Sequence, residues 1–161
     1  KGCGIGKIDD IFAGGGITQA VQTGSNSGGI AETLKAVQCG DADIVFTNLV
    51  DFDMLFGHRN DSRGYADALA QFDAALPDML EAMRPADVLI ITADHGCDPT
   101  TPSTDHSREY VPLLVIGSAL NSEVDLGIRA SFSDVACTLA DLLGLAERFP
   151  GTSFARTLRP R

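Results

Sequence analysis

The chain has 161 residues, a length that fits one domain. Hydrophobic residues make up 44% of it and charged residues 21%, which is typical of a folded globular protein and argues against general disorder. The formal net charge of -10 argues against nonspecific binding to nucleic acid or to an anionic membrane surface, because both need clustered cations.

The first elements are predicted from glycine-rich stretches and from apolar runs. The glycine-rich stretches at 2–6 and 14–16 match neither a dinucleotide fingerprint nor a phosphate-binding loop, so they are interpreted as turns. A helix is predicted over 30–37, after the stretch 25–29, which offers several N-cap residues. Residues 44–47 form a continuous β-branched and apolar run, the pattern of a strand that is covered on both faces.

The middle of the chain predicts one long helix and two further strands. Apolar residues recur at helical spacing over 65–83, where Pro77 predicts a kink or two abutting helices. Residues 88–92 and 113–116 are again continuous apolar runs of strand length.

A last helix is predicted over 135–143, with Ser133 as a candidate N-cap and Gly144 as the residue that ends it. Helical and strand segments therefore alternate through most of the chain. This order predicts an α/β fold with a mostly parallel sheet and helices on both faces.

Cellular location is predicted from what the chain contains and lacks. No apolar run approaches the roughly 20 residues that span a bilayer, and no signal peptide is visible. The four cysteines are widely spaced and form no CxxC pair, so free thiols in a reducing compartment are expected. We therefore expect a cytoplasmic protein with no membrane partner.

All three histidines lie in carboxylate-rich stretches, and this is the strongest functional signal in the sequence. His58 follows Asp53 by five residues, while His95 and His106 each directly follow an aspartate. Neutral imidazole with carboxylate is the ligand mix that suits Mn, Fe or Zn. A single histidine beside an aspartate is more often a hydrogen-bonded pair, but three such sites together favour a metal centre.

The placement of these residues supports the same interpretation. Asp53 follows the predicted strand 44–47, and Asp94 with His95 follows 88–92, where α/β proteins place their sites. The spacing of Asp53 and His58 is too long for one face of an α-helix, so a loop that wraps an ion is expected. Five metal ligands are predicted: Asp53, His58, Asp94, His95 and His106. Five exceed the need of a three-ligand zinc site and favour two ions, as in phosphoryl transfer.

Neighbouring polar residues leave alternatives open. Cys97 is a possible soft ligand, although a small residue packed near the site fits better. Arg59 and Arg108 either contact phosphate through bidentate bonds or pair with local carboxylates. Three further carboxylates are expected to orient the ligands or to cap loops: Asp51, Asp98 and Asp105.

Several long motifs resemble phosphopentomutases, a family of binuclear metalloenzymes within the alkaline-phosphatase superfamily. They are NLVDFD (48–53), GHR (57–59), TADHG (92–96), DPT (98–100) and DHSREYVPLL (105–114). GIGKI (4–8), DIFAG (10–14), SFSD (131–134) and GTSF (151–154) resemble the family as well. The resemblance covers nearly the whole chain and implies an alkaline-phosphatase-like core.

Residue by residue, the resemblance implies that Asp53, His58 and His106 bind one Mn²⁺ and that Asp94 and His95 bind another. It implies an isomerase that interconverts ribose 1-phosphate and ribose 5-phosphate, and the deoxyribose analogues, through a phosphothreonine. The implied partners are a pentose phosphate substrate and a bisphosphorylated sugar activator. The ligand set also tolerates other divalent metals.

Three family elements have no counterpart in these 161 residues: a further aspartate ligand of the second metal, the nucleophilic threonine and the cap domain. Residues 1–161 are therefore expected to be the C-terminal half of the metal-binding core, inactive alone, with a missing N-terminal core segment or self-association covering apolar surface. Two other functions remain open. One is another enzyme of the superfamily, such as cofactor-independent phosphoglycerate mutase or a phosphohydrolase. The other is a noncatalytic metal-binding fragment.

Overall fold

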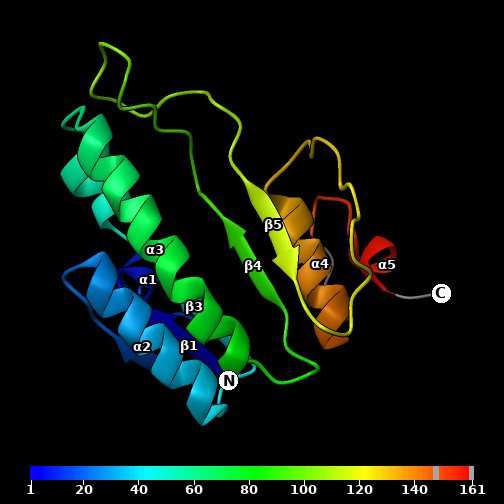
Figure 1. Cartoon of the computed structure of the whole chain (residues 1–161). Coiled ribbons are helices and arrows are strands. Elements are labelled where there is room, and N and C mark those ends of the chain that lie inside the picture. Colours follow the sequence, from blue (N-terminus) through cyan, green and yellow to red (C-terminus); the bar gives the residue numbers. More distant parts are fainter. Residues whose placement is uncertain (147–148, 160–161) are drawn as a thin grey trace. The chain divides into compact units, whose positions relative to one another are not determined.

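The computed structural model describes residues 1–146 and 149–159, which form two compact units (Figure 1). Unit 1 comprises Lys1–Arg84 and His95–Val111, and unit 2 comprises Pro85–Asp94 and Pro112–Arg161. Unit 1 contains β1 (Gly2–Ile5), α1 (Ile8–Ile11), β2 (Gln19–Val21), α2 (Asn26–Cys39), β3 (Ile44–Thr47), the π-helical turn η1 (Phe52–Gly57) and α3 (Ser62–Ala82). Unit 2 contains β4 (Leu89–Thr92), β5 (Leu113–Ile116), α4 (Ser133–Leu143) and α5 (Ala155–Leu158).

The sheet of unit 1 is parallel throughout, with strand order β2-β1-β3. Gly4 pairs with Phe46 and Ile5 pairs with Thr47, so these two pairs lie on opposite faces. Thr47 bonds to Thr33 of α2 at 2.6 Å, whereas the ring of Phe46 contacts Phe12, directly after α1. Helices therefore cover both faces of this sheet, as the sequence predicted.

The prediction of a turn at 2–6 is wrong for its first residues, which form β1. Glycine fits in this strand because its lack of a side chain leaves room for the close approach of α1. A Cβ on Gly4 would lie 3.0 Å from the side chain of Ile8, which is itself only 2% exposed. The stretch 14–16 does form a turn, with positive φ at Gly14 and Gly16.

Helix α2 starts four residues earlier than the apolar pattern predicted, because Ser25 caps it. The Ser25 hydroxyl accepts a hydrogen bond from the Gly28 amide at 3.2 Å. At the other end Gly40 adopts a left-handed conformation, and the Arg84 guanidinium donates to the carbonyls of Cys39 and Gly40. A cation at this position also complements the helix dipole. Helices α2 and α3 pack side by side (Figure 1).

Helix α3 runs unbroken through Pro77, so the prediction of two abutting helices is wrong. Its N-terminus is capped by Asp61, whose carboxylate accepts from the Gly64 amide at 2.9 Å. Proline removes one backbone hydrogen bond. Met79, two residues further on, is only 5% exposed, so tertiary packing of this helix face favours the helix despite that loss.

In unit 2, β4 and β5 pair antiparallel and form a separate two-stranded sheet. Helix α4 begins at Ser133 itself, so the prediction of Ser133 as N-cap is wrong. The hydroxyl of Ser131 accepts the Ser133 amide instead, at 3.1 Å. Gly144 ends α4 in a left-handed conformation, as predicted.

A buried carboxylate organises the C-terminal part of unit 2. Asp134 is 4% exposed, and its two oxygens accept from the Thr152 amide at 2.8 Å and from Arg129 Nε at 2.8 Å. Arg129 also lies over the ring of Phe154, 5.5 Å from its centroid. Hydrogen bonding from Thr152, and then from Arg129, lowers the pKa of Asp134.

All four cysteines are free thiols, as expected. Within the described residues, no helix is long and apolar enough to cross a membrane.

Candidate metal centre

Asp53 and His58 share one turn of π-helix, which corrects the expectation of a loop between them. The amide of His58 donates to the carbonyl of Asp53 at 3.0 Å, five residues back. On an α-helix these residues would point in different directions, but a π-helical turn places them on the same side. Such turns are frequent at functional sites because one extra residue redirects a side chain.

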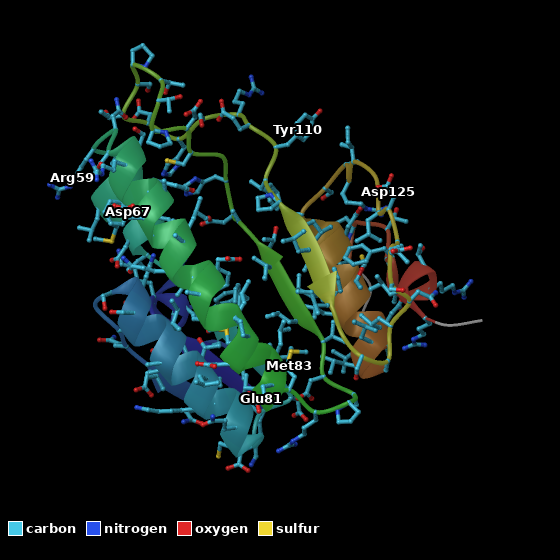
Figure 2. All side chains as sticks on the ribbon, viewed as in Figure 1. Arg59, Asp67, Glu81, Met83, Tyr110 and Asp125 are labelled. Carbon is cyan, nitrogen blue, oxygen red and sulfur yellow. The ribbon has the colours of Figure 1, made fainter. Side chains whose placement is uncertain are left out.

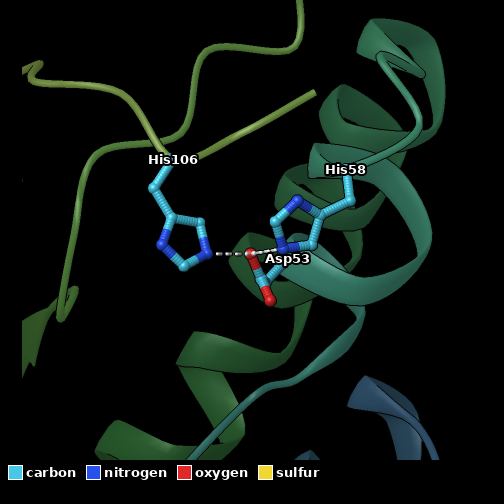
Figure 3. Close-up of side chains that lie close together, drawn as sticks. All are labelled: Asp53, His58 and His106. Carbon is cyan, nitrogen blue, oxygen red and sulfur yellow. Dashed lines mark ion pairs between the residues drawn. The ribbon is translucent and has the colours of Figure 1, made fainter. Parts of the chain in front are cut away.

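The three imidazoles of the chain converge on one carboxylate oxygen. Nε2 of His58 and Nε2 of His106 each lie 3.3 Å from Asp53 Oδ1 (Figure 3). Nε2 of His95 lies 3.9 Å from the same atom. Although 35% of the Asp53 side-chain surface is exposed, Oδ1 is buried and accepts no hydrogen bond.

The orientation of His58 is fixed by the backbone carbonyl of Thr104. Nδ1 of His58 lies 2.5 Å from that oxygen, and a carbonyl can only accept, so Nδ1 carries the proton. In the neutral ring Nε2 then presents a lone pair toward Asp53 Oδ1. Two acceptors that face each other at 3.3 Å are unfavourable unless a cation or a proton lies between them.

A backbone bridge brings His106 to the site. Gly96 pairs with Ser107, whose amide donates to the Gly96 carbonyl at 2.9 Å. The Ser107 hydroxyl in turn accepts the amide of Asp98 at 3.0 Å. A Cβ on Gly96 would lie 2.7 Å from the Ser107 carbonyl, so only glycine permits this approach.

His95 belongs to the same cluster through its ring. It stacks on His106 with 3.6 Å between the ring centroids, and its Nδ1 lies 3.2 Å from the Gly96 carbonyl. The group whose ligand atoms all lie within 4.8 Å of one another comprises Asp53, His58 and His106. Asp94 is exposed and is the last residue of its segment in unit 2. Its role as a ligand stays a prediction, as does that of His95.

Cys97 packs against the π-helical turn. A Cβ on Gly57 would lie 2.4 Å from the Cys97 sulfur, so the thiol fills the space that the glycine leaves. Burial raises the pKa of this thiol, and the charge of Asp53 raises it further. This position fits the packing role expected from the sequence.

Asp51 and Asp98 form local hydrogen bonds. Asp51 accepts the Asn26 amide at 2.7 Å, while the Asn26 side chain accepts the Asp51 amide at 2.9 Å, which ties the start of η1 to α2. Asp98 accepts the amide and the hydroxyl of Thr100, and these bonds lower its pKa. Arg59 is exposed and points away from the ribbon, with Nε 3.4 Å from the Met54 carbonyl (Figure 2).

Sequence reasoning assigned no role to the residues that act through backbone geometry. Thr104 contributes only a carbonyl, and Gly57 and Gly96 contribute the absence of a side chain. Asn60, which has a φ of 52°, was also missed. Its position two residues after His58 was the available signal, because asparagine tolerates the left-handed conformation better than most residues.

A family model described as the metalloenzyme superfamily matches residues 7–147. The phosphopentomutase of Caldanaerobacter subterraneus subsp. tengcongensis is 54% identical over 96% of the chain, and that of Acetivibrio thermocellus is 55% identical over 93%. The matched region makes up 39% of each relative, so the chain spans well under half of their length.

A solved structure also shares the fold. The PH0037 protein from Pyrococcus horikoshii matches 94% of the chain and 51% of its own chain, with a TM-score of 0.68. Because the sequence identity is only 22%, this similarity supports a shared fold and nothing further.

Proposed function

The chain belongs to the metalloenzyme superfamily, and on that premise we propose that it is part of a phosphopentomutase. The proposed reaction is the isomerisation of ribose 1-phosphate to ribose 5-phosphate and of the deoxyribose analogues. Relatives named phosphopentomutase support it, being 52–55% identical over more than nine-tenths of the chain.

The structural observation that carries the proposal is the environment of the Asp53 Oδ1 atom. This atom is buried, accepts no hydrogen bond and faces imidazole nitrogens at 3.3 Å. A divalent cation among Asp53, His58 and His106 would satisfy all three groups at once, so the donor set fits a metal. The Thr104 carbonyl would keep His58 in the tautomer that leaves Nε2 available.

We further propose a second divalent ion on Asp94 and His95, with Mn²⁺ as the metal at both positions. Paired ions stabilise entering and leaving oxygens in phosphoryl transfer. The stacking of His95 on His106 supports a role close to the first ion. The donor set by itself also accommodates Zn, Fe or Co.

The proposed substrate is a pentose phosphate, and a bisphosphorylated sugar is the proposed activator. The net charge of -10 makes bound cations a means of attracting such anions. The nucleophilic threonine and the sugar-phosphate cap are expected in parts of the protein outside these residues. We therefore expect the 161-residue chain alone to be inactive. Free thiols support the proposed cytoplasmic location.

Exposed apolar side chains beside α1 support a covering partner for unit 1. Ile11, Phe12 and Phe46 are 64%, 50% and 48% exposed and lie on or near one face of the sheet. Another segment of the protein or a second copy of the chain is proposed to cover them. Neither nucleic acid nor a membrane is proposed as a partner.

The test uses the complete protein loaded with Mn²⁺. Conversion of ribose 1-phosphate to ribose 5-phosphate without phosphate release would support the proposal. Release of inorganic phosphate would indicate a phosphohydrolase, and conversion of phosphoglycerate alone would indicate the other mutase. Metal binding without turnover of any of these would indicate a noncatalytic metal-binding protein. Each of these three outcomes would contradict it.

A further inference from the structure

Asn60 combines two unusual features next to the proposed metal centre. Its φ of 52° lies in the left-handed region, which few residues with a side chain adopt, although asparagine tolerates it better than most. Its Oδ1 atom is buried and has no hydrogen-bond partner. Unfavourable local features that persist in a fold often mark functional positions.

The side-chain nitrogen of Asn60, unlike its oxygen, has a hydrogen-bond partner. Nδ2 donates to the Thr101 carbonyl at 3.0 Å, across 41 residues of sequence. The reverse orientation of the amide would set its oxygen against that carbonyl, so the observed orientation is the favourable one.

Thr101 belongs to the loop 98–104, which also carries the carbonyl that orients His58. The start of the loop is stiffened by Asp98, whose backbone carbonyl accepts the amide and the hydroxyl of Thr101 at 3.2 and 3.0 Å. The end of the loop meets His58 Nδ1 at the Thr104 carbonyl, 2.5 Å away. Two hydrogen bonds therefore attach this loop to the segment 58–60.

We propose that Asn60 is a positioning residue for the metal centre: its amide holds the loop 98–104 so that the Thr104 carbonyl fixes the His58 imidazole. The functional role of Asn60 rests on the proposed metal centre. The effect of Asn60 on the orientation of His58 can be tested without metal.

The first test is the tautomer of His58, measured by ¹⁵N NMR on histidine-labelled protein without metal. Spectra are taken at about pH 8.5, where unperturbed imidazole is neutral. Asn60→Gly and Asn60→Asp both tolerate the left-handed backbone but cannot donate to Thr101. The signals of His58 are assigned with a His58→Gln variant.

The wild-type protein is expected to show a protonated Nδ1 and an unprotonated Nε2 at His58. Both Asn60 variants should show a mixture with the other tautomer. Asn121→Ala is the matched control, because Asn121 donates its side-chain amide to backbone carbonyls within unit 2, at 2.8 Å for Arg159. It should leave His58 unchanged. Circular dichroism establishes that each variant is folded.

The second test is Zn²⁺ affinity by calorimetry. Asn60→Gly should weaken binding roughly tenfold, the low end of the effect seen when partners of metal-binding histidines are lost. Asn60→Asp is left out, because its added charge would attract the cation. Asn121→Ala should bind as wild type.

Unchanged His58 signals in folded Asn60 variants would overturn the inference, even if Zn²⁺ affinity fell. A tautomer shift with no Zn²⁺ binding by the wild-type protein would uphold the positioning of His58 and contradict the proposed metal centre. The two ideas can therefore fail separately.

Discussion

Replacing Gly57 with alanine should destabilise the protein through one contact. The new Cβ would lie 2.4 Å from the Cys97 sulfur and 3.0 Å from the Phe52 carbonyl oxygen. Adding a methyl group to packed structure costs about 1–3 kcal/mol. With a urea m-value of about 2 kcal/mol/M, this loss would lower the unfolding midpoint by about 0.5–1.5 M.

A second substitution isolates the cause. Cys97→Ala removes the sulfur, so the double variant should be less destabilised than the sum of the two single variants, with a coupling of about 1 kcal/mol or more. Gly24→Ala is the control, because nothing lies within 4 Å of a Cβ placed on Gly24. It should be neutral or slightly stabilising.

Urea unfolding followed by circular dichroism measures the stability of the wild type and the four variants. If Gly57→Ala were as neutral as Gly24→Ala, the close packing of Cys97 on η1 would be refuted. Strict additivity in the double variant would likewise show that the sulfur is not the obstacle.

Three further predictions follow from local contacts. Ser25→Ala should cost about 1 kcal/mol of stability through loss of the α2 cap, measured by urea unfolding, and a change within error would contradict the cap. Gly96→Ala should separate His106 from Asp53, because the new Cβ would meet backbone at 2.7–2.9 Å; Zn²⁺ affinity should fall at least tenfold, and unchanged affinity would contradict the bridge. The lowered pKa of Asp134, held by Thr152 and Arg129, means that its charge stabilises unit 2 above the unfolded pKa of about 3.9 and that this contribution is lost as pH falls through the lower folded pKa. Asp134→Asn should therefore flatten the acid side of a stability-against-pH curve, and an unchanged slope would argue against the network.

Continuous apolar strands and capped helices were predictable because their signals are local. β3, β4 and β5 were found at nearly their observed bounds, and Gly144 ended α4 as expected. β1 was missed because Gly2 and Gly4 suggest a turn until the approach of α1 is known. Pro77 was overinterpreted because local propensity is outweighed by tertiary packing.

For the candidate metal centre too, local sequence signals were predictive and features of the backbone were not. Histidine beside aspartate is visible in the sequence, and the structure brings His58 and His106 close to Asp53, while their role as metal ligands stays a prediction. The π-helical turn was not predictable, since a spacing of five residues suggests a loop when only α-helix and strand periods are considered. Contacts made by a backbone carbonyl, such as that of Thr104, cannot be predicted from the type of side chain.

The most direct test of the metal centre is anomalous diffraction from crystals of the protein soaked in Mn²⁺, compared with crystals of a His106→Ala variant. The account predicts an anomalous peak among Asp53, His58 and His106 that is lost or strongly weakened in the variant. A map with no peak at these three residues, or a peak that the variant leaves unchanged, would contradict it.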